Sequence, residues 1–258
     1  MIDAVWLDRV PVLAFQAALL MARLGACGMV LPGLGEADVP AHVRLGFSLA
    51  VVAVLLPPLA PHLPDVPPTA AALALLVSTE VAIGLWLGWL ARLLSFALVT
   101  AGQAIGFLIG LASVLTQDAV QGPQALATGR LLGLAAATLT LSTGLYALPL
   151  RALADSYVLL PPGSDLPTGM VVEAVVTTTA GSFALAMRLA APLVLLAVLL
   201  QVGSGLLSRA APQVQVFVLA APAQTLVGLL LLALLLPAIL SHWTEAAREG
   251  FALLPGQG

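Results

Sequence analysis

The chain has 258 residues, of which 61% are hydrophobic and only 8% are charged. A soluble domain carries about 25% charged residues, so this composition argues against a water-soluble protein with a polar exterior. The net charge is −3 and no lysine is present, which argues against a nucleic-acid-binding surface built from clustered cations. The sequence therefore predicts an all-α integral membrane protein.

Charge-free stretches recur along the whole chain, and each is long enough to cross a bilayer, which needs about 20 apolar residues. They run from Leu45 to Pro64, Leu93 to Gln117, Leu131 to Leu150, Leu189 to Ser208, and Ala210 to Thr244. Long membrane helices are therefore expected in both halves.

In the first half, helices are expected over about 10–31, 41–56, 69–115 and 128–154. Pro32 and Gly33 end the first helix, and Pro57-Pro58 end the second and begin a loop through Pro68 that is expected to be non-helical. The third helix is too long for one straight crossing, so it is expected to bend.

In the second half, a proline-rich loop over 161–167 precedes helices over about 170–207 and 214–242, with a solvated tail from Thr244. No internal repeat is visible, so residues 1–258 are expected to form a single domain. It comprises N-terminal helices over about 10–154 and a C-terminal hairpin over about 170–242.

Glu80 is an acid in apolar surroundings, where a charge is costly unless it faces protein, water or headgroups. Arg92 lies twelve residues further on, about three helical turns away, too far for a direct pair. We expect a partner elsewhere and a structural role, such as a salt bridge between subunits. A proton relay is the less favoured alternative, because a relay normally offers several acids in series.

Two amides, Gln103 and Gln201, are also expected within apolar helices. Amides in lipid tend to bridge helices, and a pore-lining position is the alternative. Gly102, Gly106 and Gly110 recur every four residues, which favours close approach of another helix. Alternatively, they reflect only the general abundance of glycine in membrane helices.

Arg188 and Arg209 bracket an uncharged stretch of membrane length, so both are candidates for headgroup contact. Beyond Arg209, Pro212 must interrupt the helix, and Gln213 and Gln215 can satisfy the backbone groups that it frees. Such a break is unusual in lipid unless it lines a cavity or is buried in protein.

This corner carries a motif that runs from Gly205 through Arg209, Pro212 and Gln213 to Phe217. It resembles the signature of the FliR family of flagellar export proteins and of their injectisome counterparts, the SctT proteins. Further landmarks follow the family's order: Pro40 to Arg44, Glu80 with Gly84 and Gly88, Ala101-Gly102-Gln103, Asp155-Ser156-Tyr157, and Leu160-Pro161.

The chain also departs from the family pattern. Gln215 stands where the family usually has asparagine, Gln224 lies near a usually basic position, and Asp118-Ala119 replaces an Asp-Pro loop. Residues 143–146 replace a histidine pair common in flagellar members. The flagellar and injectisome alternatives therefore both stay open.

The resemblance implies a channel-forming subunit of a type III export gate in the bacterial inner membrane, within the flagellar basal body. Its kinked helical hairpins would assemble with FliP-like and FliQ-like subunits, beside FlhB-like and FlhA-like components, and unfolded secreted proteins would pass through. Membrane lipid is a further partner. Pore closure is implied for Arg209, Pro212, Gln213, Gln215 and Phe217. Assembly or helix packing is implied for Pro40, Arg44, Glu80, Gly102, Gln103, Gly106, Gly110, Gln201 and Gly205.

Two other classes of function are alternatives to the export subunit. A solute transporter would show inverted repeats and a polar substrate pocket, and neither is visible. An intramembrane enzyme would need a nucleophile with a base or paired carboxylates, and no such arrangement is apparent. The sequence predicts no catalytic residue, cofactor or metal site, and a chain without lysine cannot carry a phosphate-binding Gly-Lys loop.

Overall fold

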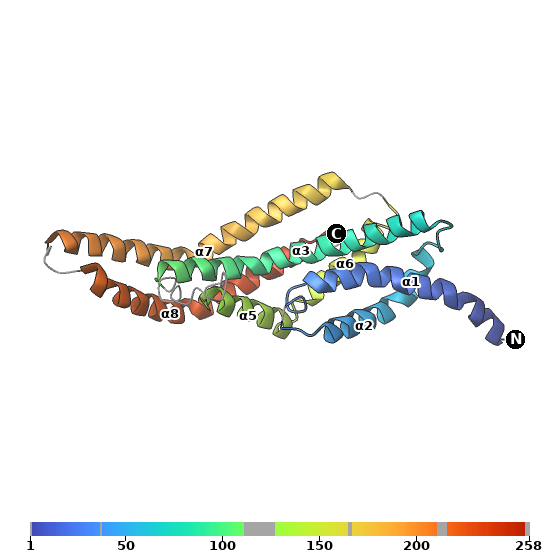
Figure 1. Ribbon diagram of the computed structural model, residues 1–258, viewed down its shortest axis with the longest axis horizontal. Coiled ribbons are helices and arrows are strands. Elements are labelled where there is room, and N and C mark those ends of the chain that lie inside the picture. Colours follow the sequence, from blue (N-terminus) through green and yellow to red (C-terminus); the bar gives the residue numbers. More distant parts are fainter. Residues whose placement is uncertain (1, 37, 111–126, 165–166, 211–215, 256–258) are drawn as a thin grey trace. The chain divides into compact units, whose positions relative to one another are not determined.

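The computed structural model describes residues 2–36, 38–110, 127–164, 167–210 and 216–255. Every regular element in these ranges is helical (Figure 1). The elements are α1 (Ile2–Val30), α2 (Ala41–Leu59), the 3₁₀ helix η1 (Ala60–His62), α3 (Ala70–Leu108), α5 (Ala127–Ser142), α6 (Ala147–Leu159), α7 (Thr168–Ala210) and α8 (Val216–Ala252).

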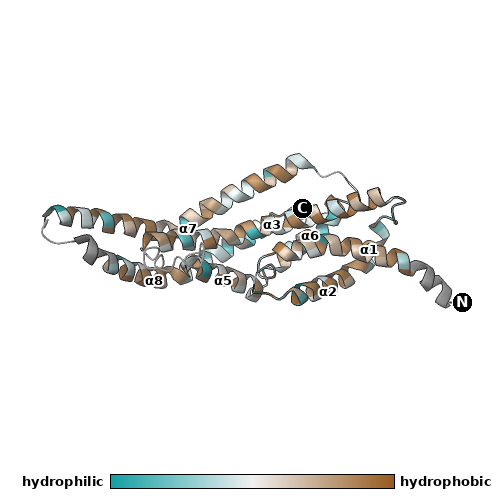
Figure 2. Ribbon diagram, in the orientation of Figure 1, coloured by the Kyte–Doolittle hydropathy of each residue, from teal (hydrophilic) through white to brown (hydrophobic). Residues whose placement is uncertain are grey.

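Five helices of the described chain are long and apolar enough to cross a membrane, and the bent pair α5 and α6 could supply a sixth span. Apolar residues cover these helices along most of their lengths (Figure 2). Many of the large apolar side chains are exposed, among them Val54, Leu75 and Leu234, which in water would be unfavourable over so wide a surface. The protein is an all-α integral membrane protein.

Two compact units divide the chain. The first comprises Met1–Leu93, Thr140–Thr178 and Arg248–Gly258, and the second comprises Leu94–Leu139 and Thr179–Ala247. The long helices α3, α7 and α8 each contribute to both units, so neither unit is a separate stretch of the chain. A single domain over 1–258 stays a prediction.

Proline is less disruptive in α2 than the sequence suggested. The helix continues through Pro57 and Pro58 to Leu59, and η1 then occupies part of the loop expected to be non-helical. Both prolines lie in the last turn, and their fixed φ is compatible with a helix. Each lacks the N–H that would bond four residues back, but α2 ends one residue later at Leu59, so the loss is confined to its C-terminal end.

Three other boundaries differ from the expectation. The helix expected over 128–154 is broken into α5 and α6, which are bent by 68°, and Gly144 at the break has a φ of 75°. Within the described residues, the long third segment shows no such break up to Leu108, because α3 is one helix of 39 residues. Helix α8 extends to Ala252, and Phe251 and Leu254 are buried, so the tail after Thr244 is not a solvated extension.

Candidate functional site

One stripe of α3 faces α1 and carries the most specific chemistry in the described chain. It consists of Glu80, Gly84, Gly88 and Arg92, which recur every four residues and therefore lie on one side of the helix. Residue numbers rise together along both helices, because Gly84 packs against the backbone of Arg23 and Gly88 packs against the backbone of Cys27. The two helices therefore run parallel along this stripe.

Glu80 forms an ion pair with Arg23, and both side chains are fully buried. The Nε and Nη2 atoms of Arg23 donate to the two carboxylate oxygens of Glu80, each over 2.8 Å. This two-point geometry is the strongest form of an arginine–carboxylate contact. The partner that Glu80 needs is therefore within the same chain. The structural role expected from the sequence is present, but the example given for it, a salt bridge between subunits, is not what the structure shows for Glu80.

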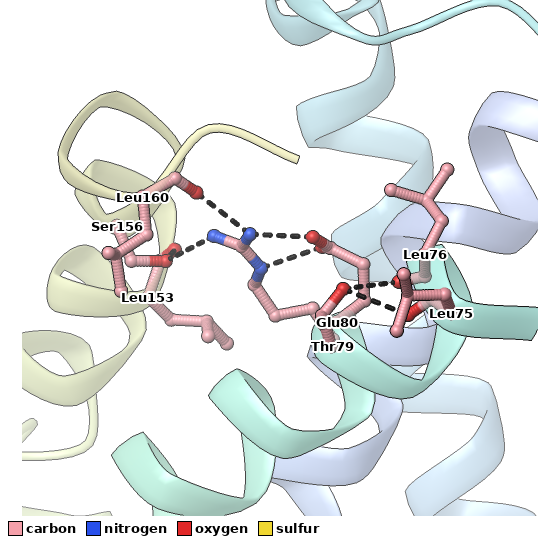
Figure 3. Close-up of polar contacts among 8 residues, drawn as sticks. Leu75, Leu76, Thr79, Glu80, Leu153, Ser156 and Leu160 are labelled. Carbon is pink, nitrogen blue, oxygen red and sulfur yellow. Dashed lines mark hydrogen bonds and ion pairs between the residues drawn. The ribbon is translucent and has the colours of Figure 1, made fainter. Parts of the chain in front are cut away.

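The same guanidinium also reaches α6. Its Nη1 donates to Ser156 Oγ over 3.0 Å, and its Nη2 donates to the Leu160 carbonyl oxygen over 2.9 Å. Figure 3 shows Glu80, Ser156 and Leu160 converging on it. The ring of Tyr157 stacks over the guanidinium carbon, 4.0 Å from the ring centre. One side chain therefore joins α1, α3 and α6 through four hydrogen bonds and a cation–π contact.

The two glycines of the stripe allow α1 and α3 to approach this closely. A Cβ atom added to Gly84 would overlap the carbonyl oxygen of Arg23, and one added to Gly88 would lie 2.8 Å from the Cys27 carbonyl oxygen. Real Cβ atoms do not approach backbone oxygens so closely, and small residues are what permit close helix contact in membranes. The ion pair thus depends on both glycines for its geometry.

Arg92 closes the other end of the stripe. Its Nη1 donates to the Val30 carbonyl oxygen at the end of α1 over 3.2 Å, and its Nη2 contacts Glu36 Oε2 at 3.3 Å. A cation is favourable beside the last carbonyls of a helix. Because this pair is partly exposed, it stabilises the protein less than the buried pair at Glu80 does.

Other helix ends also receive a polar side chain from a distant segment. Gln16 donates to the Ala60 carbonyl oxygen, where α2 gives way to η1. In the second unit, Gln224 and Thr225 of α8 donate to the Leu108 and Ile109 carbonyl oxygens at the end of α3, over 2.7 and 2.9 Å. Where the bilayer excludes water, a carbonyl oxygen at a helix end without a hydrogen-bond donor costs free energy, and these side chains supply the donor.

Gly102 marks a second close crossing, which lies within the second unit. Thr128 Oγ1 donates to the Gly102 carbonyl oxygen over 2.7 Å, and a Cβ atom at Gly102 would lie 2.7 Å from the Thr128 carbonyl oxygen and 2.9 Å from the Cα atom of Gly129. The backbones of α3 and α5 therefore touch here. Gly106 is buried, and Gly110 has a φ of 83° just beyond the end of α3.

The remaining candidates from the sequence are not gathered at one place. Gln103, Gln201 and Arg209 are exposed, and nothing lies within 4 Å of the position that a Cβ atom would take at Gly205. Phe217 belongs to the first turn of α8, whereas Pro212, Gln213 and Gln215 lie outside the described residues. The assembly and pore-closure roles of these residues stay predictions.

Pro40 and Arg44 lie at the start of α2, where Pro40 directly precedes the first helical residue. The Nη2 of Arg44 donates to the Val39 carbonyl oxygen over 3.0 Å. This contact orders the turn that leads into α2, and the role of the two residues in assembly stays a prediction.

Sequence reasoning missed Arg23 as the partner of Glu80, and it missed Gln16 and Thr225 altogether. A signal existed for Arg23, because it is the one charged residue between Val10 and Gly35. None of these groups is arranged for bond making, since Arg23 and Glu80 neutralise each other away from any solvent. The arrangement holds helices together instead.

Comparison with known proteins gives a consistent result. Residues 14–250 match the model of the family described as bacterial export proteins, family 1. The flagellar biosynthetic protein FliR of Caulobacter vibrioides is 34% identical over 92% of this chain and 95% of its own length. FliR of Escherichia coli is 31% identical over 91% of this chain and 89% of its own. The Yop proteins translocation protein T of Yersinia pestis is 31% identical over 88% of both chains.

Proposed function

We propose, from the premise that this chain belongs to family 1 of the bacterial export proteins, that it is the channel-forming subunit of a flagellar type III export gate. Its general role is that of a membrane component of a type III protein-export apparatus. The observation that carries the proposal is the alignment with FliR over nearly the full length of both chains. In this role it is required to move flagellar proteins across the inner membrane and to build the flagellum.

The experiment is deletion of the gene in its own host, followed by measurement of flagellar proteins in the culture medium. We expect secretion and motility to be lost and to return when the gene is supplied in trans. A second candidate is an injectisome subunit, favoured by the similarity to the Yop translocation protein. Normal motility with loss of secreted effector proteins would support that alternative and overturn the flagellar proposal.

The partners belong to the same proposal. FliP-like and FliQ-like subunits would surround the chain, with FlhB-like and FlhA-like components beside them. Support comes from the many exposed apolar side chains together with exposed Gln103 and Gln201, which can hydrogen-bond a neighbouring subunit. Purification of the tagged chain in mild detergent should recover both kinds of subunit. Recovery of the chain alone under conditions that preserve other membrane complexes would contradict it.

We further propose that the corner between α7 and α8 helps to close the pore. It contains Arg209, Pro212, Gln213, Gln215 and Phe217. The support is the sequence, in which Pro212 is expected to interrupt the helix between two long apolar helices. Backbone at such a break is tolerated only where protein or an aqueous cavity surrounds it.

Replacing Arg209, Gln213 and Phe217 together with alanine should make the reconstituted complex leak ions, because the groups that block the conduit are removed. The measurement is the conductance of the assembled complex in liposomes. Arg188→Ala is the matched control, since Arg188 is also an exposed arginine of α7, and it should leave the conductance low. A triple variant that assembles normally and stays closed would rule out the proposed role.

A further inference from the structure

The end of α6 lacks its usual backbone donors. Leu160 is the residue that ends the helix, and Pro161 and Pro162 follow it. The N–H groups of the two residues beyond a helix end commonly close the last turn by bonding to its carbonyl oxygens. Proline has no N–H group, so positions 161 and 162 cannot do this. Leu160 is buried, so water does not replace them there.

Arg23 of α1 supplies donors to this end from outside. It donates to the carbonyl oxygen of Leu160 and to the hydroxyl of Ser156, and it lies under the ring of Tyr157. These contacts fall on the last turn of α6 and on its C-cap residue, Leu160. A positive charge at this position is also favourable for the helix dipole, and Glu80 fixes the plane of the guanidinium by binding its other edge.

We propose that Arg23 is the C-terminal cap of α6 and thereby a positioning residue that sets where this helix ends. This role is distinct from charge pairing with Glu80. Two apolar side chains of similar volume can replace a buried ion pair without leaving a charge unpaired. They cannot donate to Leu160 or Ser156, so the two roles can be separated by experiment.

The test is amide hydrogen exchange on the full chain in mild detergent, with the variant Arg23→Met/Glu80→Met. We expect amides over 153–160 to exchange about ten- to a hundredfold faster, the factor for losing bonds to a charged donor. Peptides from α7 over 183–200 should exchange as in the wild type. Arg151→Met is the matched control, because Arg151 is an exposed arginine on α6, and it should change nothing at 153–160.

A rescue variant separates capping from general stability. Pro161→Gly with Pro162→Ala restores two backbone N–H groups, which can close the last turn at the carbonyl oxygens of residues 157 and 158 and so hold the end of α6 without Arg23. These acceptors differ from Leu160, so in the Met/Met background we expect part of the lost protection to return. In the wild-type background the same change should gain little. If Met/Met does not fold, Arg23→Lys serves instead, since an ammonium cannot reproduce the four hydrogen bonds and should give the same local effect. Unchanged exchange at 153–160, or faster exchange spread evenly over all helices, would each overturn the proposal.

Discussion

Arg23→Met is expected to lower the free energy of unfolding by about 3–5 kcal/mol, the usual loss when one partner of a buried ion pair is removed. Glu80 is fully buried, so its carboxylate would remain in an apolar interior with its strongest partner gone. The measurement is the equilibrium unfolding of the purified chain in mixed micelles as the fraction of denaturing detergent is raised. Glu80→Gln should be similarly destabilising, because it leaves the guanidinium without its counter-charge.

The matched control is Arg151→Met, which removes an exposed arginine from the same unit and should change the free energy by less than about 0.5 kcal/mol. The double variant Arg23→Met/Glu80→Met should recover much of the loss, because no charge is then left unpaired. Single variants as stable as the wild type would show that the ion pair contributes nothing to the fold.

Gly84→Ala should destabilise the protein by about 1–3 kcal/mol, the range for overpacking a filled interior. The added methyl group would overlap the backbone oxygen of Arg23, and a backbone atom cannot move away as a flexible side chain can. Helices α1 and α3 would have to separate, which would lengthen the bonds between Arg23 and Glu80. The same unfolding measurement applies, and Gly84→Ala combined with Gly88→Ala should be worse than either alone.

Gly46→Ala provides the comparison within the same unit. Nothing lies within 4 Å of the position that its Cβ atom would take, so the methyl group has room. Alanine is also the better helix former by about 1 kcal/mol, so this variant should be neutral or slightly more stable. Equal losses at Gly46 and Gly84 would mean that close packing against α1 is not the reason for a glycine at position 84.

Much of the fold could be predicted, because its signals are local. The length of the apolar stretches indicated most of the long helices. For α7, the expected bounds 170–207 agree with Thr168–Ala210 to within a few residues. Glu80, Gly84 and Gly88 follow at four-residue spacing, which lets them share one side of a helix. What the spacing could not give was the partner, since Arg23 lies 57 residues away in the sequence.

The break between α5 and α6 was missed for a related reason. Residues 131–150 are free of charge throughout, so hydropathy indicates one continuous span. The bend arises at Gly144, whose positive φ ends a regular helix without any change in polarity. Likewise, Pro57 and Pro58 looked like stops, but each keeps a helical φ and removes a single N–H donor, so α2 continues through both and ends at Leu59.

Hydrogen-bond donors from one helix bind carbonyl oxygens at the end of another, and this affects the order in which the bonds form during synthesis. Thr225 leaves the ribosome 116 residues after Ile109, whose carbonyl oxygen it binds, and Leu160 follows Arg23 by 137 residues. During synthesis, the end of α3 is therefore made before the side chains that bind its carbonyl oxygens in the finished protein, whereas Arg23 is made before the carbonyl oxygen that it binds. A nascent polypeptide stopped before α8 lacks Gln224 and Thr225, so the two bonds that these side chains make to the end of α3 can form only late in translation.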